Sequence, residues 1–196
     1  MIEKLDRRQK YTRKVLKESF IKRMQEKPLS AITIKEVCES ADINRSTFYS
    51  HYKDIYDLAF QIEDNIIEDI SATLSAYNYS KNEEALQMTE KLLEYIAENR
   101  DSCQTLFSEH GDPRFQKKVM MLAHTHLLKT LEVENTNVPY NSEYLSLYIA
   151  NGSIHVVQHW LKSGMKESPK EIAELITKLA KRGLSSFSDT PPMFSI

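Results

Sequence analysis

The sequence predicts an all-α protein with a small N-terminal helical head and a larger helical body, about nine helices in all. Apolar residues recur three or four positions apart along most of the 196 residues, which is the period of an amphipathic helix. No stretch shows the sustained alternation of apolar and polar residues that is typical of a half-buried strand. Only four glycines interrupt the chain, which also favours helices.

The opening segment, Leu5 to Glu26, is predicted to be one amphipathic helix. Leu16, Phe20 and Met24 form its apolar stripe, and Pro28 stops it. Its N-terminal half holds a run of cations, which are Arg7, Arg8, Lys10, Arg13, Lys14 and Lys17. Cations at this end oppose the helix dipole, so helix stability does not explain them, whereas contact with phosphates does.

Two short helices joined by a tight turn are predicted next. Thr33 followed by Glu36 forms a capping-box pattern at the start of the first, which carries an apolar face of Ile34, Val37, Cys38 and Ala41. Asp42 stands where the turn needs a left-handed backbone, which Asp tolerates better than most residues. Asn44 is expected to cap the second helix, which is predicted to run through His51. A shared core and a small polar face on the second helix are typical of a helix-turn-helix.

The segment Thr33–Asp54, TIKEVCESADINRSTFYSHYKD, resembles the DNA-binding region of the TetR family of one-component regulators. The similarity covers residues 1 to about 55 and consists of the capped helix, the Ala-x-Ile turn and the run Ser-Thr-Phe-Tyr-x-His-Tyr. The resemblance implies a dimeric DNA-binding regulator, for which we predict a repressor acting on a near-palindromic double-stranded operator. Two residues depart from the family: Pro28 replaces a usual glycine, and Ile55 replaces a phosphate-contacting lysine, which leaves open whether Lys53 takes over that contact.

DNA contacts are expected from two sets of residues. Base edges come within reach of the first turn of the second short helix, which holds Arg45, Ser46 and Thr47. Arg45 is the candidate for a bidentate contact to guanine. Phosphate contacts orient the head without reading sequence, and they are expected from Lys14, Thr33, Tyr49, His51 and Lys53.

The charge distribution agrees with this assignment. Residues 1–53 hold 13 Lys and Arg against 7 Asp and Glu, whereas the rest of the chain holds 13 against 21. A basic block attached to an acidic body indicates that the N-terminal part alone approaches a polyanion.

Six further helices are predicted in the body, over residues 54–75, 83–98, 102–108, 114–134, 143–163 and 169–187. Loops are expected over residues 77–82, 109–113 and 135–141. Gly111 and Gly164 suit helix C-caps, and Pro113 and Pro169 suit first turns. We expect a DNA-binding domain over residues 1–53, an effector-binding and dimerisation domain over 54–187, and a mobile tail over 188–196.

The helix expected over residues 143–163 is apolar on more than one side, so both of its sides must be buried, and the helix over 169–187 carries a broad apolar stripe. The TetR resemblance implies a four-helix bundle between two subunits, and the stretch YIANGSIHVVQHWLKSGMKESPKEI loosely resembles the dihydroxyacetone-kinase-regulator subgroup. The expected interface residues are Tyr144, Ile149, Val156, Trp160, Ile172, Leu175, Ile176 and Leu179.

A small-molecule effector of unknown identity is implied by the resemblance alone. Its candidate lining residues are Met88, Phe107, Met120, Met121, His124, Tyr148 and Trp160. The same residues also suit an ordinary core. Control by a protein partner through the C-terminal domain therefore stays open as the alternative.

Other chemistry finds no support in the sequence. His155 and His159 are four residues apart but lack an evident third metal ligand, and neither Cys38 nor Cys103 has metal-ligand spacing. No catalytic set, cofactor motif, signal peptide or membrane-spanning apolar run is evident. We therefore expect a cytoplasmic regulator that is not an enzyme and carries no cofactor.

Overall fold

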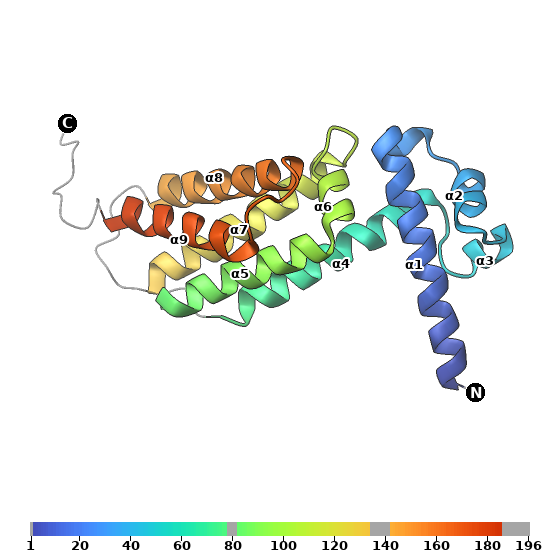
Figure 1. Cartoon of the computed structure of the whole chain (residues 1–196), viewed down its shortest axis with the longest axis horizontal. Coiled ribbons are helices and arrows are strands. Elements are labelled where there is room, and N and C mark those ends of the chain that lie inside the picture. Colours follow the sequence, from blue (N-terminus) through green and yellow to red (C-terminus); the bar gives the residue numbers. More distant parts are fainter. Residues whose placement is uncertain (1, 78–81, 134–141, 186–196) are drawn as a thin grey trace. The chain divides into compact units, whose positions relative to one another are not determined.

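The computed structural model describes residues 2–77, 82–133 and 142–185, in which nine α-helices and one short 3-10 helix account for all regular structure (Figure 1). The prediction of an all-α fold is confirmed. The loop expected at residues 135–141 and the tail expected at 188–196 lie outside the described residues. The elements are α1 (Ile2–Glu26), η1 (Leu29–Ala31), α2 (Ile34–Ala41), α3 (Arg45–Tyr49), α4 (Ile55–Ser75), α5 (Asn82–Glu98), α6 (Arg100–Leu106), α7 (Pro113–Val133), α8 (Ser142–Lys162) and α9 (Pro169–Ser185).

The helix α3 is shorter than predicted. It ends at Tyr49, and the backbone N–H groups of both His51 and Tyr52 donate to the Phe48 carbonyl. The helix therefore ends in a tightened turn, and the chain continues toward α4. The residues after Tyr52 belong to the start of α4, because the carboxylate of Asp57 accepts a hydrogen bond of 2.8 Å from the backbone N–H of Lys53.

The chain forms two compact units. The first comprises residues 1–67 and 101–116, and the second comprises residues 68–100 and 117–196. Each unit has buried apolar side chains of its own.

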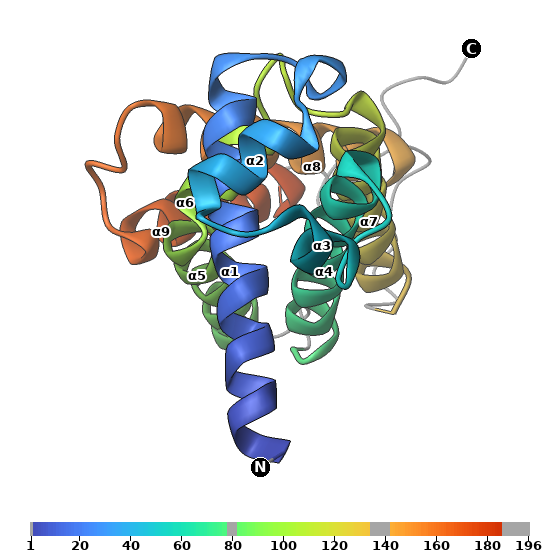
Figure 2. The same ribbon diagram turned by 90° about the vertical axis from the view of Figure 1, so that its right-hand side faces the viewer.

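In the first unit, α2 crosses α1 and packs against it, and α3 follows α2 through a tight turn (Figure 2). Leu16 and Phe20 of α1, Val37 of α2 and Phe48 of α3 are completely buried. The apolar stripe predicted for the opening helix is therefore confirmed. The three helices of the head are held by this burial, since α2 and α3 are too short to be stable alone.

In the second unit, α9 packs against both α5 and α8. Leu93, Trp160, Ile172, Ala173 and Ile176 form its central apolar cluster. The end of α8 is closed by a left-handed Gly164 (φ +94°), as predicted.

Gly111 has a different role from the predicted one. Gly164 is the one glycine with a positive φ among the described residues, so Gly111 is not a left-handed C-cap. A Cβ atom at Gly111 would instead lie 2.0 Å from the backbone oxygen of Leu106. Glycine is required there because two stretches of backbone approach closely.

None of the described helices combines the length and the apolar character needed to span a membrane.

Candidate nucleic-acid interface

The start of α2 is held by a network around Glu36. Thr33 and Glu36 form the predicted capping box, in which the Thr33 backbone N–H and hydroxyl donate to Glu36 Oε2 at 3.0 and 2.7 Å. The second carboxylate oxygen, Oε1, lies 2.6 Å from the Lys27 ammonium. The hydrogen bonds from Lys27 and then from Thr33 lower the pKa of Glu36 to about 2. The network fixes the start of α2 to the end of α1.

The turn between α2 and α3 matches the prediction. Asp42 adopts the left-handed conformation (φ 53°, ψ 43°), and the backbone N–H of Ile43 returns to the Cys38 carbonyl at 2.9 Å. Asn44 caps α3, because its side-chain oxygen accepts a hydrogen bond of 3.0 Å from the Ser46 backbone N–H. The turn therefore determines the direction in which α3 leaves α2.

The polar face of α3 points to solvent. Arg45, Ser46 and Tyr49 are exposed, and Thr47 is half-buried. Phe48 lies on the opposite side, fully buried, with its ring edge-to-face on Tyr49 at 5.8 Å. An exposed polar face above a buried aromatic anchor is the arrangement that presents side chains to a groove.

The predicted phosphate contacts differ in their availability. Lys53 is exposed, and the side chain of Lys14 is 72% exposed with a weak ion pair to Glu18. His51 is half-buried, and its pKa is lowered by burial and, to a lesser extent, by the Arg13 guanidinium. The hydroxyl hydrogen of Thr33 is already donated to Glu36, so a phosphate would have to compete for it. The direct contacts of all these residues stay predictions.

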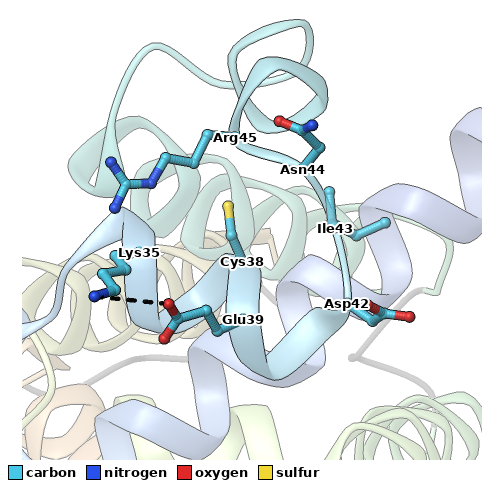
Figure 3. A pocket seen from close by; sticks show the side chains of 7 residues that line it. All are labelled: Lys35, Cys38, Glu39, Asp42, Ile43, Asn44 and Arg45. Carbon is cyan, nitrogen blue, oxygen red and sulfur yellow. Dashed lines mark ion pairs between the residues drawn. The ribbon is translucent and has the colours of Figure 1, made fainter.

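A pocket of about 480 Å³ opens beside the turn of the helix-turn-helix (Figure 3). It is lined by Lys35, Cys38, Glu39, Asp42, Ile43, Asn44 and Arg45. In Figure 3 the Cys38 sulfur points between Arg45 and Asn44, and Lys35 and Glu39 form an ion pair of 3.8 Å along α2. The Arg45 side chain thus borders a concave surface that holds a second cation and two carboxylates.

Two ion pairs near the helix-turn-helix were not predicted from the sequence. The Lys27–Glu36 ion pair joins residues nine apart, one just after the end of α1 and the other in α2, so no helical spacing indicates it. Lys35 and Glu39 were detectable as an i, i+4 pair on α2, but nothing in the sequence places them beside Arg45.

The candidate effector residues are spread over both units. Phe107 belongs to the first unit, and the others belong to the second. Met88 and Trp160 are buried, Met120 and His124 are half-buried, and Met121 and Tyr148 are 58% and 80% exposed. The His124 Nε2 atom is buried and has no hydrogen-bond partner. The indole N–H of Trp160 donates to the Glu167 carbonyl at 2.9 Å.

The candidate interface residues form three groups by exposure. Tyr144, Leu175 and Leu179 are 72%, 46% and 61% exposed. Ile149 and Val156 are half-buried. The remaining three lie in the core of the second unit, and they are Trp160, Ile172 and Ile176.

His155 and the two cysteines have ordinary structural surroundings. Among the described residues, no three His, Cys, Asp or Glu side chains gather to hold a metal ion. The His155 Nδ1 atom lies 2.8 Å from the Asn151 carbonyl one turn earlier. Both cysteines are buried thiols, and burial raises the pKa of Cys103 to about 12. This environment favours the unreactive thiol form.

The chain thus combines a helix-turn-helix with an α-helical C-terminal region, and comparison with known proteins identifies its family. Residues 83–182 match the TetR family model described as a transcriptional regulator C-terminal region. The chain belongs to the TetR family of transcriptional regulators.

Individual relatives are distant. The chain is 23% identical over 175 residues to the uncharacterised HTH-type transcriptional regulator YxbF of Bacillus subtilis (strain 168), covering 85% of this chain and 44% of that protein. It thus spans less than half the length of this curated relative. Among solved structures, it resembles the dihydroxyacetone kinase operon activator DhaS (19% identity, TM-score 0.62, 91% and 98% of the two chains). It also resembles FadR from Bacillus subtilis in complex with stearoyl-CoA (12% identity, TM-score 0.61, 85% and 96%). At these identities the structures show a shared fold.

Proposed function

We propose that this regulator binds DNA sequence-specifically through residues 1–53 and does so as a homodimer. One observation carries the proposal: α3 exposes Arg45, Ser46 and Tyr49 on a helix that is capped by Asn44 and anchored by the buried Phe48. A five-residue helix whose polar side is exposed and rigidly supported is suited to reach base edges in a major groove. The proposed role is regulation of transcription and not catalysis.

Electrostatics supports the same surface. The 13 Lys and Arg of residues 1–53 exceed the 7 Asp and Glu, so the head attracts a polyanion that the acidic remainder repels. The predicted phosphate contacts Lys14 and Lys53 are both exposed. Each phosphate contact releases counterions, which makes the affinity dependent on salt.

Selection of operator sequences from a random duplex library, followed by fluorescence anisotropy, tests the proposal. Arg45→Ala should cost about 1–3 kcal/mol at one base position and relax the sequence preference there. Lys14→Ala should weaken all duplexes evenly and reduce the salt slope by about one. Failure of the wild type to bind any duplex at low salt refutes DNA binding, and an unchanged preference in Arg45→Ala refutes the assignment of Arg45.

The dimer proposal is supported by an apolar surface on α8 and α9. Tyr144 and Tyr148 are exposed one turn apart on α8, and Leu175 and Leu179 are exposed one turn apart on α9. A monomer rarely leaves large apolar side chains clustered in water, so a second copy is the proposed cover. We assign the direct interface to these exposed residues, and we assign Trp160, which is buried in the core cluster, to its support.

Sedimentation analysis of a matched pair of variants tests the dimer. Leu179→Glu should shift the protein to a monomer, because it would bury a charge in the interface. Tyr56→Glu changes a side chain of similar exposure on α4 (59% against 61%) and should leave the dimer intact. A monomeric wild type at micromolar concentration contradicts the proposal.

We further propose that a small-molecule effector binds in the C-terminal region and releases the operator. The buried, unpartnered His124 Nε2 supports a polar ligand there, because a buried imidazole nitrogen without a hydrogen bond is unfavourable. The FadR structure contains stearoyl-CoA, which shows that this fold accommodates a ligand in another protein. DhaS is described as an activator, so control by a protein partner, or activation in place of repression, is the alternative.

A thermal-shift screen separates the two modes of control. A metabolite that raises the melting temperature of the wild type but not of His124→Ala supports effector binding at this residue. A shift that persists in His124→Ala places the ligand elsewhere. If no metabolite stabilises the protein, control by a partner is favoured.

A further inference from the structure

The carbonyl of Met24 loses its normal helical partner. In an α-helix the carbonyl of residue i accepts from the backbone N–H of residue i+4, and for Met24 that residue is Pro28, which has no N–H. The preceding bond is intact, since the Lys27 N–H donates to the Arg23 carbonyl at 3.1 Å. The whole Met24 residue is 1% exposed, so its carbonyl is buried and would be costly to leave without a hydrogen bond.

A histidine from a distant part of the sequence supplies the missing donor. The Nδ1 atom of His110 lies 2.9 Å from the Met24 oxygen. His110 stands in the connection between α6 and α7, and both residues belong to the first unit. A carbonyl oxygen can only accept, so the His110 ring must carry its proton on Nδ1.

The connection that carries His110 is itself tightly organised. The Gln116 amide donates to the Leu106 and Ser108 carbonyls at 3.4 and 3.2 Å. The backbone N–H of His110 donates to Ser108 Oγ at 3.2 Å. Gly111 packs so closely against Leu106 that a larger residue would not fit. These contacts, which lie within the α6–α7 connection, position the imidazole of His110 against the end of α1.

We propose that His110 is a positioning residue for DNA recognition, because it clamps the C-terminal turn of α1 to the α6–α7 connection. The end of α1 also carries Lys27, whose ion pair with Glu36 fixes the start of α2. A displacement of His110 therefore loosens the support of the helix-turn-helix without touching its DNA-facing side chains. This inference rests on the proposed function, since it assigns a residue that tunes operator affinity.

The decisive experiment compares operator affinities of full-length variants by fluorescence anisotropy, under conditions in which all are folded. His110→Ala should weaken operator binding about threefold to tenfold, the range of one neutral hydrogen bond. Pro28→Ala restores an N–H at the position that serves Met24. The double variant should therefore bind within about twofold of Pro28→Ala alone. Glu109→Ala, an exposed neighbour, serves as the control and should leave the affinity unchanged.

A second readout requires no DNA. Long-range proton–nitrogen correlation spectra of nitrogen-15-labelled protein at neutral pH should show His110 protonated on Nδ1, whereas a free imidazole favours Nε2. The wild type, Pro28→Ala, His110→Ala and the double variant form a double-mutant cycle. The changes in unfolding midpoint of the two single variants should not add up to the change in the double variant.

The outcomes separate the two proposals. The inference is overturned by an Nε2 proton on His110, by additive unfolding midpoints, or by an operator affinity of His110→Ala that equals the wild-type value. If the wild type selects no duplex, the proposed function fails. The positioning role in DNA recognition then fails with it, while the spectra and midpoints still decide whether His110 holds the end of α1.

Discussion

Replacement of Phe48 by alanine is the most direct test of how α3 is held in place. The helix α3 contains five residues, whereas an isolated helix needs roughly 12–15 residues to be even marginally stable. Phe48 is 0% exposed, and its ring lies 5.6 Å from that of Tyr52. Removal of a fully buried phenylalanine costs about 3–5 kcal/mol, which is a large share of the roughly 5–15 kcal/mol that stabilises a typical domain.

We expect Phe48→Ala to melt α3 locally and to abolish operator binding. Urea unfolding gives the free-energy loss, and native-state hydrogen exchange of residues 45–49 locates it. Tyr49→Ala is the matched control, because Tyr49 is adjacent on the same helix but 58% exposed, and its loss should cost no more than about 1.5 kcal/mol, the value of its edge-to-face contact with Phe48. A loss below about 1 kcal/mol in Phe48→Ala would falsify the view that packing against the head creates this helix.

Two further predictions concern glycine and histidine. Gly111→Ala should destabilise the protein by about 1–3 kcal/mol or more, since its Cβ would meet the Leu106 oxygen at 2.0 Å. Gly152→Ala has open space around it within α8 and should stabilise by about 1 kcal/mol in urea titrations, so equal effects would refute the steric argument. The pKa of His51 is lowered from 6.5 by burial and then by Arg13, so its contribution to stability is complete above pH 6.5 and is lost as the pH falls through the lowered value. His51→Gln should flatten the decline of stability below pH 6.5 in pH-dependent unfolding, and an unchanged slope would contradict the assignment.

Much of the structure of the N-terminal head can be predicted from local sequence, because its caps and its turn depend on residues only a few positions apart. The capping box of Thr33 and Glu36, the left-handed Asp42 and the Asn44 cap depend on hydrogen bonds between residues at most three apart or on one backbone conformation. The buried position of Phe48 follows from helical periodicity. These features were predicted correctly and required no knowledge of the tertiary structure.

The limits of local reasoning appear where two periodic patterns overlap. Trp160 is a candidate both for a ligand site and for a dimer interface, and the structure places it in the apolar core of the second unit. An apolar stripe on a helix shows that one side is covered, but it does not distinguish a core from a partner. Leu175 and Leu179 belong to the same amphipathic helix as the buried Ile172 and Ile176, and the packing of α9 against α5 and α8 decides which of them is exposed.

The all-α fold and the helix-turn-helix, with the Asn44 cap and the buried Phe48 of α3, follow from the sequence alone, because helical periodicity and capping depend on residues close together in the chain. The contacts that hold the helix-turn-helix in place do not follow from the sequence. Glu36 of α2 forms an ion pair with Lys27, which lies nine residues earlier in the chain. The carbonyl that Pro28 leaves without a donor is satisfied by His110, which lies 86 residues beyond Met24. Such contacts depend on how distant segments pack, and only the tertiary structure brings them together.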